Sequence, residues 1–321
     1  MSMTYRFFSP PPARAATGLT AEVYRQMRED FLGPMPTFQV LSVAPSLLAP
    51  AWALMREALL VGDGRVDREV VASAVSRANR CRFCVDAHVT LLHSLGEHDL
   101  AEEIARGGTP PLVSWALDSR RPRATGWTSP HGPGITGTVL AFHFINRVVS
   151  ALLSPDLLPG GLQRFPAVRS VGGRLAARTT RRTPAPGASL ALLAPDLSPA
   201  VLPGPVGVAY AALREAAGAG GELLSDVARD TVVATVRWED GAHPARPADW
   251  AADLVRDLPP ADRVAARIVL LAAFAPGAIS RGDVELRRLT HPSDADLVRL
   301  VAYGAMAATD HVARALDPAH L

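Results

Sequence analysis

The sequence contains no lysine, so all 33 of its basic residues are arginines. A Schiff base needs a lysine amine, which excludes pyridoxal phosphate enzymes and lysine-dependent aldolases. A P-loop is excluded as well, because its lysine holds the nucleotide phosphates. The arginines are balanced by 31 acidic residues, and the net charge of +2 indicates neither a nucleic acid nor a membrane surface as partner.

Long apolar runs are also missing. No run reaches the roughly eighteen residues of a membrane-spanning helix, and residues 1–20 lack the apolar segment of a signal peptide. We therefore expect no membrane span, no secretion and a cytoplasmic location. The chain is nevertheless 48% hydrophobic, which is enough to bury a large core.

Helical spacing of the apolar residues predicts an all-α, multi-helix fold, with proline and glycine marking the breaks. The predicted helices span 20–30, 38–61 (interrupted near Pro45 and Pro50), 68–78 (with Asp67 as N-cap), 81–95, 97–106, 136–153, 167–180, 207–238 (weakened at 218–221), 249–257, 261–274 and 294–316. A loop is expected over 118–134, and a linker or an ordered loop over 183–205.

These breaks divide the chain into four segments. They are an N-terminal tail with a short helix (1–36), a helical core (37–153), a proline-rich connection (154–206) and a C-terminal helical half (207–321). Residues 259–311 repeat an apolar helix, a break and a long helix, which leaves open a degenerate second helical repeat without cysteines.

The only two cysteines, Cys81 and Cys84, form a CxxC pair in the segment 80–88 (RCRFCVDAH). Two cysteines cannot build a disulfide framework, and such a pair in a cytosolic protein is typical of redox or metal chemistry. If Cys81 starts a helix, the helix dipole favours its thiolate. The two side chains share one helical face, close enough for a disulfide.

Two further residues complete a candidate catalytic site. His88 follows Cys84 by four residues, so the imidazole lies on the same helical face and can take the thiol proton. Glu69, on the preceding helix, can hold that imidazole directly or through a water. In the expected cycle Cys84 attacks a hydroperoxide and Cys81 resolves the sulfenic acid, and an external dithiol then reduces the disulfide. The order of the two cysteines stays open, because the first one attacks in thioredoxin-type motifs.

The segments 68–72 and 79–88 resemble the core of the carboxymuconolactone decarboxylase and alkyl hydroperoxidase D-like superfamily. Its redox members have a glutamate, eleven residues, CxxC, three residues and a histidine, which Glu69, Cys81, Cys84 and His88 match. The resemblance implies an all-α bundle of that family, homo-oligomers and thiol-dependent peroxidase activity without metal or flavin. It also implies a lipoyl-bearing or thioredoxin-like reductant.

The resemblance has one departure and leaves alternatives open. Some peroxidase members have a second histidine between the cysteines, where this chain has Arg82 and Phe83. The decarboxylase branch generally lacks the cysteine pair, yet a cofactor-free lyase using His88 and Glu69 is one alternative function, and a non-enzymatic redox sensor is another. For the cysteines themselves, the alternatives are buried structural thiols or a zinc site with His88 and either His93 or Glu69.

Overall fold

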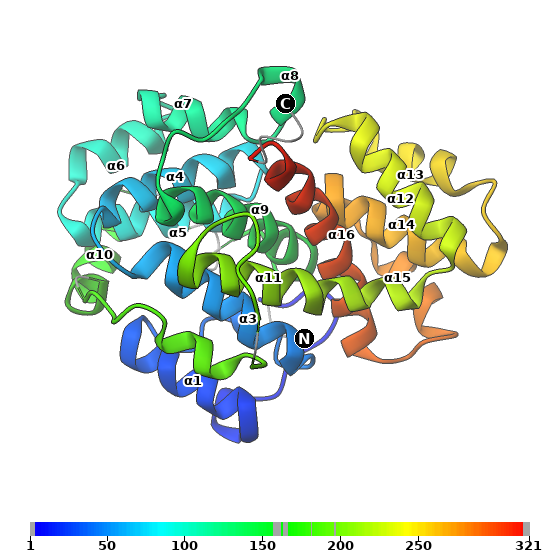
Figure 1. Ribbon diagram of the computed structural model, residues 1–321, viewed down its shortest axis with the longest axis horizontal. Coiled ribbons are helices and arrows are strands. Elements are labelled where there is room, and N and C mark those ends of the chain that lie inside the picture. Colours follow the sequence, from blue (N-terminus) through cyan, green and yellow to red (C-terminus); the bar gives the residue numbers. More distant parts are fainter. Residues whose placement is uncertain (1–3, 157–161, 163–165, 181, 196, 317–321) are drawn as a thin grey trace.

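All regular structure in the computed structural model is helical (Figure 1). The structure describes residues 4–156, 162, 166–180, 182–195 and 197–316. Within these residues the one strand-like feature is an isolated antiparallel bridge between Tyr5 and Leu153. The predicted all-α fold is confirmed.

The helices range in length from 4 to 21 residues. In chain order they are α1 (Gly18–Asp30), α2 (Pro36–Gln39), α3 (Pro45–Met55), α4 (Arg65–Ala78), α5 (Arg82–Leu95), α6 (His98–Ala105), α7 (Pro111–Asp118), α8 (Pro122–Thr125), α9 (Pro133–Leu152), α10 (Pro166–Thr180), α11 (Gly204–Gly218), α12 (Asp226–Glu239), α13 (Pro247–Val255), α14 (Pro260–Phe274), α15 (Arg281–Arg288) and α16 (Asp294–Arg314).

Proline explains where many of these helices begin. The first N–H groups of a helix have no partner inside it, so a proline there loses no hydrogen bond. Pro45 accordingly starts α3 and Pro133 starts α9. The predicted interruption at Pro50 is wrong, because Pro50 lies inside α3; the helix changes at Arg56–Leu60 instead, where it widens into one π-helical turn.

Other differences from the expected helices are local. Asp67 is not the N-cap of α4, because the helix starts at Arg65 after Gly64 in the left-handed conformation (φ 79°). The predicted loop at 118–134 contains α8, and neither α7 nor α15 was expected. The weak point at 218–221 is a complete break, because α16 passes so close that a Cβ on Gly220 would lie 2.3 Å from the Arg299 carbonyl oxygen.

Helix α9 runs through the centre of the molecule, with α4 and α5 on one side and α16 toward the C-terminal helices on the other (Figure 1). By length and composition it could cross a membrane, but 89% of its apolar window is buried inside the fold. It therefore serves as the core helix on which the others pack. One continuous hydrophobic core joins residues from α1 to α16.

The described residues of the connection over 183–205, which are 183–195 and 197–205, form an ordered loop. Its 3₁₀ turn Ala188–Leu192 docks on the buried carboxylate of Glu57, which accepts hydrogen bonds from the Gly187 N–H (2.8 Å) and the Ser189 hydroxyl (2.6 Å). The division of the chain into four segments and the second helical repeat stay predictions.

Candidate active site

The two cysteines lie where α4 ends and α5 begins. Arg80 turns the chain in the left-handed conformation (φ 57°), which is uncommon for a residue with a side chain. Cys81 is the N-cap of α5, as expected, and Cys84 lies in its first turn. Both side chains are buried and their sulfurs are 2.6 Å apart. Because sulfurs in a disulfide are about 2.05 Å apart, the pair can be joined with little movement.

Glu69 and His88 form a buried pair beside the cysteines. His88 Nδ1 donates to Glu69 Oε2 over 2.5 Å, and Arg65 Nε donates to the other carboxylate oxygen over 2.7 Å. Burial opposes ionisation of Glu69, but the charges of Arg65 and His88 outweigh it, so its pKa is lowered. The glutamate is thus a carboxylate that fixes the proton on Nδ1 and leaves Nε2 of His88 as the proton acceptor. The predicted pairing across α4 and α5 is present.

The two thiols differ in acidity. Burial opposes ionisation of Cys81, but hydrogen bonds from Cys84 and from the Ser150 side chain outweigh it and lower its pKa. Burial, together with the Cys81 sulfur, raises the pKa of Cys84 well above the ordinary value, although Asn146 opposes the rise. The Cys84 sulfur is hydrogen-bonded to the Cys81 sulfur and not to His88. Cys81 is therefore the more acidic thiol of the pair, and Cys84 needs a base.

Cys84 and His88 open into one apolar cavity of about 340 Å³. Its wall is built mainly from aliphatic and aromatic side chains, and the edge of the His88 ring contacts Phe142 with the ring centroids 4.5 Å apart. The lining includes Phe31, Met35, Phe38, Met55, Leu59, Phe83, Leu91, Phe142 and Ile145. A small apolar molecule fits this space, with a thiol and an imidazole at its wall.

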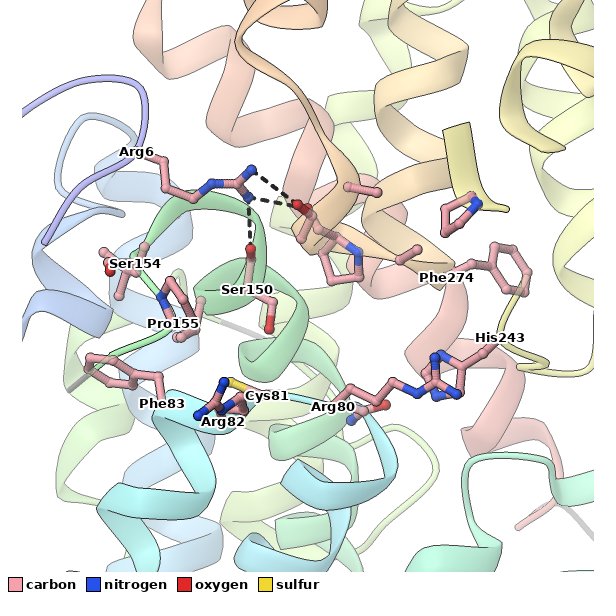
Figure 2. Close-up of a pocket in the computed structure, with 18 of the residues that line it drawn as sticks. Arg6, Arg80, Cys81, Arg82, Phe83, Ser150, Ser154, Pro155, His243 and Phe274 are labelled. Carbon is pink, nitrogen blue, oxygen red and sulfur yellow. Dashed lines mark hydrogen bonds between the residues drawn. The ribbon is translucent and has the colours of Figure 1, made fainter. Parts of the chain in front are cut away.

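Cys81 lines a different cavity, of about 500 Å³ (Figure 2). Arg80 and Arg82 lie on either side of Cys81, while Arg6 and Ser150 lie across the cavity from them. Part of this wall comes from the C-terminal half, between His243 and Ala278. The dithiol therefore lies between an apolar cavity and an arginine-lined one.

The zinc alternative has no geometric support. Within the described residues no three His, Cys, Asp or Glu side chains converge as metal ligands. His93, the candidate fourth ligand, is instead bonded to His98 (2.9 Å) and to Glu102 (3.0 Å).

Known proteins are similar to this chain both locally and along most of its length. The model of the carboxymuconolactone decarboxylase family matches residues 47–106, which include the dithiol, Glu69 and His88. An alkyl hydroperoxide reductase of Mycobacterium tuberculosis (strain ATCC 25618 / H37Rv) is 34% identical over 321 residues, covering 94% of this chain and 92% of that protein. The chain belongs to the carboxymuconolactone decarboxylase family. No solved structure matches it.

In this protein, polar residues of α9 also lie beside the two thiols. Asn146 and Ser150, one helical turn apart, lie beside the thiols and favour lower pKa values for Cys84 and Cys81 respectively. Sequence reasoning missed both, although two polar side chains at a spacing of four in an apolar helix are a detectable signal. His143, one turn of α9 before Arg147, is a buried core histidine whose Nε2 is hydrogen-bonded to Ser119 Oγ over 2.9 Å.

Proposed function

We propose that this protein is a thiol peroxidase that reduces organic hydroperoxides through a Cys81/Cys84 dithiol–disulfide cycle, assisted by His88 and Glu69. The observation that carries the proposal is the apolar cavity whose wall joins the Cys84 thiol to an imidazole held by a buried carboxylate. The name of the mycobacterial relative, alkyl hydroperoxide reductase, supports the same activity and substrate class.

The oxidative step takes place at Cys84. His88 removes the thiol proton, directly or through a water, because the raised pKa of Cys84 keeps it protonated otherwise. The thiolate attacks the distal oxygen of the hydroperoxide, the O–O bond breaks, and Cys84 becomes a sulfenic acid. The leaving alkoxide takes the proton from His88 and departs as an alcohol. Glu69 stabilises the transient imidazolium by its charge.

The resolving step uses the second thiol. The Cys81 thiolate attacks the sulfenic sulfur 2.6 Å away, the S–O bond breaks, and hydroxide leaves as water after taking up a proton. The product is the Cys81–Cys84 disulfide. An external dithiol then reduces it, so the protein needs neither a metal nor a flavin for the cycle.

The first test is the consumption of cumene hydroperoxide by the purified protein with dithiothreitol as reductant. Wild type is compared with Cys84→Ser and Cys81→Ser. We expect turnover in wild type and none in Cys84→Ser. Cys81→Ser should be oxidised once, leaving a sulfenic acid on Cys84 that dimedone traps.

Two other outcomes would favour the alternative functions. Disulfide formation with stoichiometric oxidant but without turnover would indicate a redox sensor. Cleavage of a lactone substrate that persists in Cys84→Ser would indicate a lyase that uses His88 and Glu69.

The proposal includes a cytoplasmic homo-oligomer. Among the described residues the two most exposed large apolar side chains are Trp238, which is 84% exposed, and Leu289, which is 81% exposed. A homo-oligomer would cover such surfaces. Light scattering on the purified protein tests this, and a monomer at all concentrations would contradict it.

A further inference from the structure

We infer that the reductant reaches the disulfide through the arginine-lined cavity at Cys81, and that it is a slender thiol carrying a carboxylate or similar anionic group. This inference rests on the proposed peroxidase cycle and deepens it. It assigns the two substrates to two different cavities, with the hydroperoxide at Cys84 and the reductant at Cys81.

The limited access to the two sulfurs supports separate cavities for the hydroperoxide and the reductant. Cys81 is only 2% exposed and Cys84 only 5%, so neither sulfur is presented on the surface. Each cysteine lines its own cavity, and the two cavities share Phe83 as a wall residue. The flat active-site surface of a globular thiol protein cannot reach a sulfur recessed in this way. A narrow thiol-bearing molecule can enter a cavity of about 500 Å³, a volume within the range of small-molecule sites.

The charges that line the Cys81 cavity are all of one sign. Arg6, Arg80 and Arg82 line it, and no aspartate or glutamate does so among the described residues. Arg6 is engaged by backbone carbonyls, including those of Ala151 (2.8 Å) and Ile279 (2.6 Å). Arg80 and Arg82 are exposed, and no described carboxylate pairs with either of them. These two guanidinium groups are thus available to an incoming anion.

A buried arginine behind the wall adds to this positive charge. Arg120 is 5% exposed and donates to Asn79 Oδ1 (2.6 Å), the Phe274 carbonyl (3.1 Å) and the Gly241 carbonyl (2.8 Å). Its partners are neutral, so its charge is not cancelled. Asn79 and Phe274 themselves line the cavity.

Neither the adjoining groove nor the apolar cavity is lined by positive charges alone. The adjoining groove, of about 820 Å³, shares Arg80 and Arg82 with the Cys81 cavity, but Asp86 and Glu102 line it as well. Among the described residues that line the apolar cavity, the titratable ones are Cys84 and His88. An anion that binds Arg80 and Arg82 therefore meets no lining carboxylate only on the side of the Cys81 cavity.

The reductive step follows from this placement. A thiolate of the reductant attacks the Cys81 sulfur, the Cys81–Cys84 bond breaks, and Cys84 leaves and takes up a proton. The second thiolate of the reductant attacks its own mixed-disulfide sulfur and releases Cys81 as a thiolate. The reductant departs as a disulfide, oxidised by the two electrons that the protein gains.

The test uses dihydrolipoate and dihydrolipoamide, two dithiols that differ only in a carboxylate against a neutral amide. The full-length protein is first oxidised with diamide, so that the disulfide forms without hydroperoxide. Its reduction is then followed at low ionic strength by quenching and thiol alkylation. We expect dihydrolipoate to be about fivefold faster, the effect of two exposed ion pairs, and the preference to shrink in high salt.

The variant R80Q/R82Q should lose the preference. The matched control R25Q/R256Q removes two exposed arginine charges outside both cavities and should keep it. Equal rates in wild type, a preference that survives in R80Q/R82Q, or faster reduction by a thioredoxin protein would each overturn the inference. Hydroperoxide turnover with dithiothreitol but no carboxylate preference defeats this inference alone. Carboxylate-selective reduction without hydroperoxide turnover defeats the proposed peroxidase alone.

Discussion

Replacing Glu69 by glutamine tests how the buried carboxylate acts on the reaction. The substitution keeps the shape of the side chain but removes the charge that stabilises protonated His88 across 2.5 Å. A hydrogen bond between charged partners contributes about 1.5–3 kcal/mol, and about 1.4 kcal/mol corresponds to a tenfold change in rate. We therefore expect E69Q to oxidise Cys84 about 10 to 100 times more slowly.

The assay is a single-turnover measurement of sulfenic acid formation in the Cys81→Ser background, with cumene hydroperoxide as oxidant. The measured rate then reports the oxidation of Cys84, the step that needs the base, apart from hydroperoxide binding and from the attack by Cys81. E69Q also leaves Arg65 without its carboxylate, so we expect a loss of about 2 kcal/mol in the free energy of unfolding. Urea unfolding of each variant shows whether the protein is folded under the conditions of the rate measurement.

The chain offers a matched control at a second glutamate–histidine pair. Glu102 accepts from His93 over 3.0 Å and from Arg169 over 2.8 Å, and it lines neither of the two cavities at the dithiol. E102Q should oxidise Cys84 at the wild-type rate. The reasoning is refuted if folded E69Q reacts as fast as wild type, or if E102Q is slowed to the same extent.

Three further outcomes follow from the same geometry. Iodoacetamide should alkylate Cys81 before Cys84 at neutral pH, as mass spectrometry of peptides would show, because the pKa of Cys81 is the lowered one. Ala176→Phe should fill the apolar cavity and slow oxidation by hydroperoxide, whereas Ala278→Phe should fill the other cavity and slow reduction. Wild type should lose more stability than E69Q as the pH falls below about 4. Because the pKa of Glu69 is lowered in the folded protein, its carboxylate stabilises the fold fully above the unfolded pKa of about 4.3, and this contribution is lost as the pH falls toward the folded pKa.

Each of these outcomes can be contradicted directly. Alkylation of Cys84 first would reverse the assignment of Cys81 as the more acidic thiol. Equal effects of the two cavity-filling substitutions on both half-reactions would mean that the cavities are not separate routes. Identical acid sensitivity of wild type and E69Q in urea unfolding from pH 7 to 3 would show that Glu69 is not ionised in the folded protein.

Local sequence was sufficient for the part of the site that depends on one helix and its neighbour. The spacing from Cys81 through Cys84 to His88 spans two turns of α5, and Gly96 ends that helix with a left-handed residue (φ 96°). The α4–α5 turn is short, so Glu69 had few places to lie other than beside this helix. The grouping of these four residues and the all-α fold were therefore predictable, because they depend on spacing, caps and breaks that a sequence displays.

The rest required the tertiary structure, because it depends on contacts between residues far apart in the chain. Asn146 and Ser150 approach the thiols only because α9 packs across α4 and α5. Arg6 and His243 line the Cys81 cavity although more than 230 residues separate them, and no local pattern links such positions. The sequence by itself determined which groups can react. Only the packing of α9 and of the C-terminal helices against them decided that the two sulfurs face different cavities, one apolar and one cationic.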